Sequence, residues 1–85
     1  MAPVTIYTTP FCGFWSAAKA LLNKKGISFT EIDVAGNAER HREMLDRANG
    51  RRTVPQIFIG STHVGGFDDL RALEQAGRLD PLLVG

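Results

Sequence analysis

The sequence predicts a small α/β fold in which helices pack around a mixed sheet. Short β-rich runs alternate with stretches whose apolar residues recur at helical spacing. The elements follow one another in the order β-α-β-α-β-β-α, and glycine or proline stands at most of the junctions. Alternation of this kind is typical of an α/β domain with a sheet between layers of helices.

The first half of the chain predicts two strands and two helices. Strands are expected over residues 4–8 and 27–34, which are rich in β-branched and aromatic residues. Between them, apolar residues at helical spacing predict a helix that ends at Gly26. A second helix is expected to begin after Asn37, which suits an N-cap, and to close at Gly50.

The second half predicts a hairpin and a third helix. A largely apolar strand is expected over 54–59, with a short partner strand around 63–64. The carboxylates at 68–69 fall in the first turn of the third helix, where the helix dipole favours negative charge. Gly77 is expected to break this helix, and residues 81–83 to finish the chain.

Length and composition narrow the class of protein. The 85 residues form one domain, 1–85, close to the smallest size that folds on a hydrophobic core alone. The net charge of +1 gives no support to nucleic-acid binding. No segment reads as a signal peptide or is long enough to cross a membrane, so a reducing, cytoplasmic location and no membrane partner are expected.

Cys12 is the candidate nucleophile. It is the single cysteine of the chain, so an internal disulfide is impossible, and no Cys/His cluster offers a structural metal site. It stands between Pro10 and Gly13, at the junction of a loop and the first helix. Backbone N–H groups and the helix dipole favour a thiolate there. The alternative, a buried structural cysteine, fits the middle of an element better than this loop.

Two further features converge on Cys12 if the element order is right. Pro55 stands at the start of the third strand, where a cis peptide would aim the Val54 backbone at a ligand beside the thiol. A trans proline at a strand start is the simpler alternative. Gly65 and Gly66 precede a helix whose N-terminus suits an anion such as a carboxylate, or they form an ordinary turn.

Taken together, these motifs resemble the glutaredoxins, and most of all the small bacterial class that carries Cys-Pro-Tyr-Cys. The resemblance covers nearly the whole chain and rests on Tyr7-Thr8, on Cys12 with the helix 18–22 behind it, on Thr53-Val54-Pro55-Gln56-Ile57-Phe58-Ile59 and on Gly65-Gly66-Phe67-Asp68-Asp69-Leu70. It implies a thioredoxin fold with a four-stranded mixed sheet flanked by helices. It also implies binding of glutathione as cosubstrate and exchange between thiols and disulfides.

The resemblance assigns roles to individual residues. Cys12 would hold glutathione as a mixed disulfide, and Pro55 would be cis. The residues expected to bind glutathione are Phe14, Arg42, Thr53, Val54, Pro55, Gly66, Phe67 and Asp68. Within this set, Val54 would pair with the glutathione backbone. Gly66, Phe67 and Asp68 would bind the γ-glutamyl end through backbone N–H groups and a carboxylate.

The chain departs from the family pattern in three places. Gly13-Phe14 replaces Pro-Tyr and is similar to monothiol relatives with Cys-Gly-Phe-Ser, several of which assemble an iron–sulfur cluster. The lysine that usually meets the glycine carboxylate of glutathione is Thr9 here. Arg42 would have to supply that charge, and a solvated surface arginine is the alternative interpretation. Trp15 occupies the position of the resolving cysteine.

The sequence therefore predicts a monothiol, glutathione-dependent oxidoreductase that removes glutathione from proteins or small mixed disulfides through Cys12. Such an enzyme is expected to be a monomer with no metal. The alternatives are a dimer that binds a [2Fe–2S] cluster between two Cys12 thiolates and two glutathiones, or a low-activity variant of a dithiol glutaredoxin. Trp15 argues against the cluster, because an indole would stand beside it.

The position of Cys12 predicts an acidic thiol. At a helix N-terminus its thiolate should predominate at neutral pH, with a pKa below the ordinary value of about 8.5. The rate of alkylation of Cys12 measured against pH checks this expectation. An inflection near the ordinary value would contradict the placement of Cys12 at the helix N-terminus.

Overall fold

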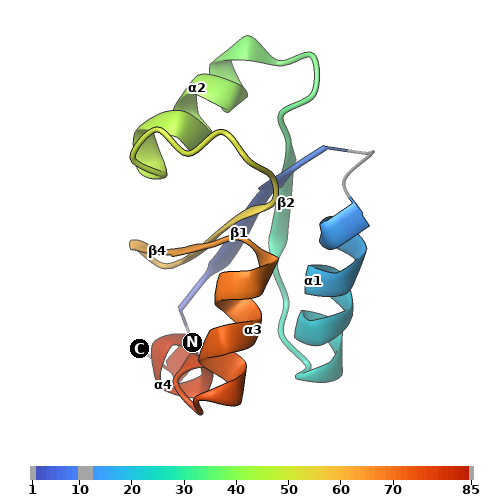
Figure 1. The fold of residues 1–85 in the computed structure, drawn as a ribbon, viewed down its shortest axis with the longest axis vertical. Coiled ribbons are helices and arrows are strands. Elements are labelled where there is room, and N and C mark those ends of the chain that lie inside the picture. The colour runs from blue at the N-terminus through green and yellow to red at the C-terminus, as the bar shows by residue number, and fades with distance from the viewer. Residues whose placement is uncertain (1, 10–12, 85) are drawn as a thin grey trace.

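The chain forms a four-stranded mixed sheet with helices on both faces, in a computed structural model that describes residues 2–9 and 13–84, apart from the side chains of Phe14 and Trp15 (Figure 1). The strands lie in the order β2-β1-β3-β4 and are β1 (Val4–Thr8), β2 (Thr30–Asp33), β3 (Gln56–Ile59) and β4 (Thr62–Gly65). β1 pairs with β2 in parallel and with β3 antiparallel, and β3 pairs with β4 antiparallel. The predicted fold class is confirmed.

Four helices surround the sheet within the described ranges. They are α1 (Gly13–Lys24), α2 (Ala38–Arg47), α3 (Phe67–Gln75) and α4 (Leu79–Val84). α1 is the crossover that the parallel β1–β2 pair requires, because parallel neighbours cannot be joined by a tight turn. None of these helices reaches the length and apolarity that crossing a lipid bilayer demands.

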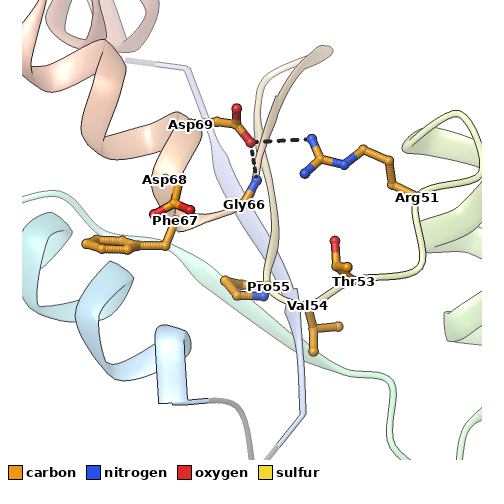
Figure 2. A pocket seen from close by; sticks show the side chains of 8 residues that line it. All are labelled: Arg51, Thr53, Val54, Pro55, Gly66, Phe67, Asp68 and Asp69. Carbon is orange, nitrogen blue, oxygen red and sulfur yellow. Dashed lines mark hydrogen bonds and ion pairs between the residues drawn. The ribbon is translucent and has the colours of Figure 1, made fainter.

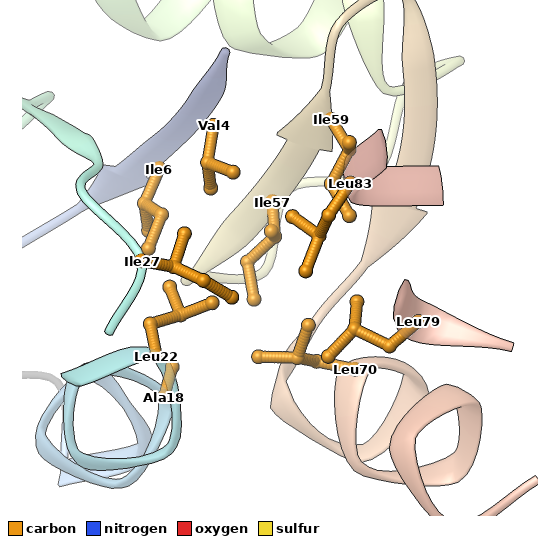
Figure 3. Packing of buried hydrophobic residues seen from close by; sticks show 10 residues of the cluster. All are labelled: Val4, Ile6, Ala18, Leu22, Ile27, Ile57, Ile59, Leu70, Leu79 and Leu83. Carbon is orange, nitrogen blue, oxygen red and sulfur yellow. The ribbon is translucent and has the colours of Figure 1, made fainter. Parts of the chain in front are cut away.

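One face of the sheet packs against α1, α3 and α4 (Figure 3). Alternate residues of β3, Ile57 and Ile59, point to this face. The buried cluster consists of Val4, Ile6, Ala18, Leu22, Ile27, Ile57, Ile59, Leu70, Leu79 and Leu83. Each fully buried Leu or Ile side chain contributes about 1.5 to 3 kcal/mol from the hydrophobic effect, so this cluster is a major source of stability.

The other face packs against α2. Its cluster consists of Tyr7, Val34, Met44, Ala48 and Phe58. The buried Tyr7 hydroxyl donates a hydrogen bond to Glu43, and Arg47 Nη1 donates to the same hydroxyl at 2.9 Å. Burial, followed by the hydrogen bond to Glu43, raises the pKa of Tyr7. This polar contact ties α2 to the central strand β1.

Two strands begin later in the chain than predicted, because the backbone at the predicted starts lies outside the hydrogen-bonded strand pairs of the sheet. The strand expected from Ile27 begins at Thr30, since the Ile27 N–H donates to the Leu22 carbonyl at 3.0 Å and closes the end of α1. The strand expected from Val54 begins at Gln56, since Pro55 has no N–H to donate.

The second helix begins as predicted and ends earlier. Asn37 is its N-cap, and the Asn37 side chain accepts a hydrogen bond from the Arg40 N–H at 3.1 Å. The helix ends at Arg47, before the expected Gly50, because the Gly50 N–H turns back to the Leu45 carbonyl at 2.8 Å. This backbone bond closes the helix and directs the chain toward β3.

The structure adds a short helix, α4, to the predicted order. Gly77 breaks α3 as expected, with φ at 71°, but the residues after it turn into helix again. Leu79 and Leu83 lie one turn apart and are buried together. Lys25 Nζ, just after α1, lies 2.8 Å from Asp80 Oδ1 and holds this end of the molecule together.

Removal of the Leu79 side chain tests the docking of α4. Leu79→Ala should lower the free energy of unfolding by about 2 to 5 kcal/mol, because it leaves a cavity in the larger cluster. Urea unfolding measures the change. Val84→Ala on the same helix is the control, since Val84 is exposed and should shift stability by no more than about 0.5 kcal/mol. Equal effects of the two changes would mean that α4 is not docked.

Candidate functional site

A cavity of about 450 Å³ lies between the loop that precedes β3 and the N-terminus of α3 (Figure 2). The loop forms one wall and the first turn of the helix forms the other. The residues that line it are Arg51, Thr53, Val54, Pro55, Gly66, Phe67, Asp68 and Asp69. The volume falls in the range of about 300 to 1,000 Å³ that small-molecule sites usually have.

The loop wall is shaped by a cis peptide bond between Val54 and Pro55. The cis isomer expected from the family resemblance is therefore confirmed. Pro55 is buried and Val54 is half-buried, whereas Thr53 is exposed at the mouth of the cavity. The loop thus presents both backbone and a hydroxyl group to the space beside the helix.

The helix wall presents unpaired donors and a carboxylate. Gly66 is the N-cap of α3, and its N–H donates to Asp69 Oδ2 at 2.9 Å. The N–H groups of Phe67 and Asp68 follow in the first turn, where an α-helix has no internal acceptor for them. Together with the positive end of the helix dipole they suit an anionic ligand group. The exposed Asp68 carboxylate suits a cationic one.

An ion pair joins the two walls. Arg51 Nη1 lies 3.3 Å from Asp69 Oδ2, and both side chains are about half exposed (Figure 2). A pair this exposed stabilises by no more than about 1 kcal/mol. Its consequence is geometric, because Asp69 engages both Arg51 and the Gly66 N–H and so sets the spacing of the loop and the helix.

Gly65 is required for this close approach. Its φ is +116°, and a Cβ placed there would lie 2.3 Å from Asp69 Oδ2 and 2.7 Å from Arg51 Nη1. A Cβ on Gly66 would meet the Pro55 carbonyl oxygen at 3.5 Å, an ordinary contact. The two glycines that were predicted to let an anion approach therefore differ in role. Gly65 makes room for the ion pair between Arg51 and Asp69, whereas a Cβ at Gly66 would fit without a clash.

The structure brings together six of the predicted site residues and places one other, Arg42, elsewhere. Thr53, Val54, Pro55, Gly66, Phe67 and Asp68 all line the cavity. Arg42 is exposed and lines a separate hollow at the start of α2, which shares no residue with the cavity. Cys12 and the side chains of Phe14 and Trp15 lie outside what the structure describes. Among the described residues, no three His, Cys, Asp or Glu side chains are grouped to hold a metal ion.

Sequence reasoning does not single out two residues that shape this site, Arg51 and Asp69. In the sequence, Arg51 is one half of the short basic pair Arg51-Arg52, and Asp69 is one of the charges expected at the start of a helix. The signal that could have found Asp69 is its position three residues after the Gly66 N-cap, which is where a carboxylate reaches back to the cap.

The fold and site define a class of protein. A mixed sheet with a cis-proline loop facing a helix N-terminus is the arrangement of thioredoxin-fold proteins, and solved structures of that fold superimpose closely. The solution structure of a Brucella melitensis glutaredoxin matches with a TM-score of 0.84 and 57% identity, covering 98% of this chain and 89% of that one. A buckwheat glutaredoxin–glutathione complex matches with a TM-score of 0.86 and 29% identity, covering 98% and 77%.

The particular family follows from the sequence comparison. Residues 4–64 match the family model described as Glutaredoxin, so the chain belongs to the glutaredoxin family and is a thiol–disulfide oxidoreductase. Glutaredoxin 3 of Escherichia coli K12 is 55% identical over 83 residues, covering 98% of this chain and 99% of that protein. A Pseudomonas aeruginosa glutaredoxin is also 55% identical, with 98% of both chains covered.

Substitution of Gly65 tests the close approach of the two walls. Gly65→Ala should cost about 1 to 3 kcal/mol of stability from backbone strain and about 0.5 to 2 kcal/mol more from displacing the Asp69 cap. Gly77→Ala is the matched control, because Gly77 also has a positive φ but a Cβ there meets no atom within 4 Å. Chemical denaturation of both variants gives the comparison. Equal losses would contradict the crowding at Gly65.

Proposed function

We propose that this glutaredoxin removes glutathione from mixed disulfides by a monothiol mechanism, with Cys12 as the nucleophile. The observation that supports this most is the cavity, which combines a cis-proline loop with a helix N-terminus and a carboxylate. A neighbour of the same fold is a buckwheat glutaredoxin in complex with glutathione. The substrates would be glutathionylated proteins or small mixed disulfides.

The helix wall suits the γ-glutamyl end of glutathione, which carries a carboxylate and an ammonium group on one carbon. The N–H groups of Phe67 and Asp68 would donate to the carboxylate, where the helix dipole adds to the attraction. The Asp68 side chain would accept from the ammonium group. Gly66 would contribute by its small size, because its N–H is already bonded to Asp69.

The loop wall suits the peptide part of glutathione. Val54 would align with the backbone of the cysteinyl residue, in the manner of a strand that adds to an extended segment. Arg51 brings a positive charge to the cavity and would attract the second carboxylate of the ligand. Arg42, which the family pattern suggested for that charge, lies in a separate hollow, and its part in binding stays a prediction.

The reaction would proceed by two thiol–disulfide exchanges. The Cys12 thiolate attacks the glutathione sulfur of the mixed disulfide, and the protein thiolate leaves and takes a proton from water. The thiolate of a second glutathione then attacks the glutathione sulfur bound to Cys12. Glutathione disulfide is released and the Cys12 thiolate is restored. The net reaction consumes one mixed disulfide and one glutathione thiol, and it yields one protein thiol and one glutathione disulfide. No step uses residue 15.

The composition of the chain favours this route over a dithiol one. Cys12 is the single cysteine, so no second thiol can resolve an adduct within the molecule. A glutathionylated peptide with glutathione, coupled to glutathione reductase, tests the proposal: the chain should show turnover and Cys12→Ser none. No turnover by the unaltered chain would overturn it. The alternative, a cluster-bridged dimer, would instead purify brown, with visible absorbance.

Removal of the Asp68 charge should weaken capture of glutathione. A charge-assisted hydrogen bond is worth about 1.5 to 3 kcal/mol, so Asp68→Asn should reduce kcat/KM for a glutathionylated peptide more than tenfold. Asp46→Asn, on the exposed side of α2, is the control and should leave kcat/KM unchanged. Unaltered kinetics of Asp68→Asn would mean that Asp68 is only a helix-end charge.

Restoring a thiol at position 15 should restore dithiol chemistry. Trp15→Cys places a second cysteine three residues after Cys12, on the first turn of α1. This variant should gain the ability to reduce internal disulfides of other proteins. It should also form an oxidised state in which Cys12 and the introduced cysteine are joined by a disulfide, so that both free thiols are lost. Insulin reduction and thiol titration measure the two effects. A folded variant that gains neither would show that Trp15 does not occupy the resolving position.

A further inference from the structure

The side chain of Gln56 links the cavity to the core of the protein. Gln56 is the first residue of β3 and has no exposed surface. Its Nε2 donates to the Thr53 carbonyl at 2.9 Å and to Thr53 Oγ1 at 3.0 Å. Its Oε1 lies 2.7 Å from His63 Nε2. A buried amide is costly unless every polar atom is bonded, and here both ends are.

The partners determine the direction of each hydrogen bond. A carbonyl oxygen can only accept, so the amide nitrogen of Gln56 must face Thr53. The amide oxygen then faces His63, and His63 Nε2 must carry the hydrogen that it shares with Gln56. The network therefore runs in one direction, from His63 through Gln56 to Thr53.

His63 anchors this network to the core. Its ring stacks on Phe58 with centroids 4.9 Å apart, and the guanidinium of Arg47 lies 4.2 Å from the centre of the same Phe58 ring. Burial lowers the pKa of His63, and the positive charges of Arg51 and Arg47 lower it further against the opposing effect of Asp69. His63 is therefore neutral at neutral pH.

The direction of this hydrogen-bond network determines how the Thr53 hydroxyl is oriented. Because its oxygen accepts from Gln56, its own hydrogen is left to donate, and Thr53 is exposed at the mouth of the cavity. We propose that Gln56, held by His63, is a positioning residue that makes the Thr53 hydroxyl a hydrogen-bond donor to a carbonyl or carboxylate oxygen of the ligand. This inference rests on the proposed function, since glutathione offers such oxygens along its length.

Reversing the polarity of the network tests the inference. The ionised carboxylate of Gln56→Glu cannot donate to Thr53 and would accept from its hydroxyl, turning that hydrogen away from the ligand. KM for a glutathionylated peptide should rise about tenfold, the effect of losing one hydrogen bond, with kcat changed less than twofold. Gln75→Glu, the same change at an exposed position of α3, should leave both constants unaltered.

Substitution of Thr53 keeps the test decisive if the buried carboxylate of the Gln56→Glu variant prevents folding. Thr53→Val should raise KM about tenfold, and Thr53→Ser, which keeps the hydroxyl, should restore it to within about threefold. Adding Gln56→Met to Thr53→Val should raise KM less than about threefold further, because the group that Gln56 orients is already gone. Equal KM values for Thr53→Val and Thr53→Ser, in a chain that turns over the peptide, would overturn the inference alone. No turnover by the unaltered chain would instead overturn the proposed function.

Discussion

The four residues of β3 are buried on both faces of the sheet, and the rest of the structure depends on how their side chains alternate. Ile57 and Ile59 pack into the cluster under α1, α3 and α4, whereas Phe58 packs under α2. Gln56 is the polar member of the strand, and its amide has hydrogen-bond partners at both ends. Helices on both faces of the sheet pack on this strand. The strand therefore fixes the position of the loop that precedes it, next to the N-terminus of α3.

Two adjacent carboxylates at the start of α3 have different surroundings and therefore different roles. Asp69 Oδ2 accepts from the Gly66 N–H and pairs with Arg51, so this oxygen serves the protein itself. Asp68 lines the cavity and is exposed. A helix N-terminus favours negative charge from either residue. The direction of each side chain, which follows from the turn of the helix, separates the structural carboxylate from the one that is open to a ligand.

The single cysteine gives this member of the family a restricted chemistry. A chain with one thiol can exchange disulfides only with a partner thiol in solution, so its turnover would depend on a small thiol such as glutathione. In the proposed mechanism the cavity would hold the glutathione part of the mixed disulfide, whose sulfur is attacked first by Cys12 and then by the thiolate of a second glutathione. Binding and chemistry would be coupled through the loop that carries Thr53, Val54 and Pro55.

Local signals in the sequence determined the order of the elements up to α3, the Asn37 cap and the break at Gly77, because each depends on residues close together in the chain. The family resemblance supplied the cis Pro55 and six residues of the cavity. Only the tertiary structure decided the rest: the docking of α4, the crowding at Gly65 and the path from His63 to Thr53. Arg51 and Asp69 lie 18 positions apart in the chain, and no local sequence pattern predicts an ion pair between them. It forms because the sheet brings the loop and the helix together.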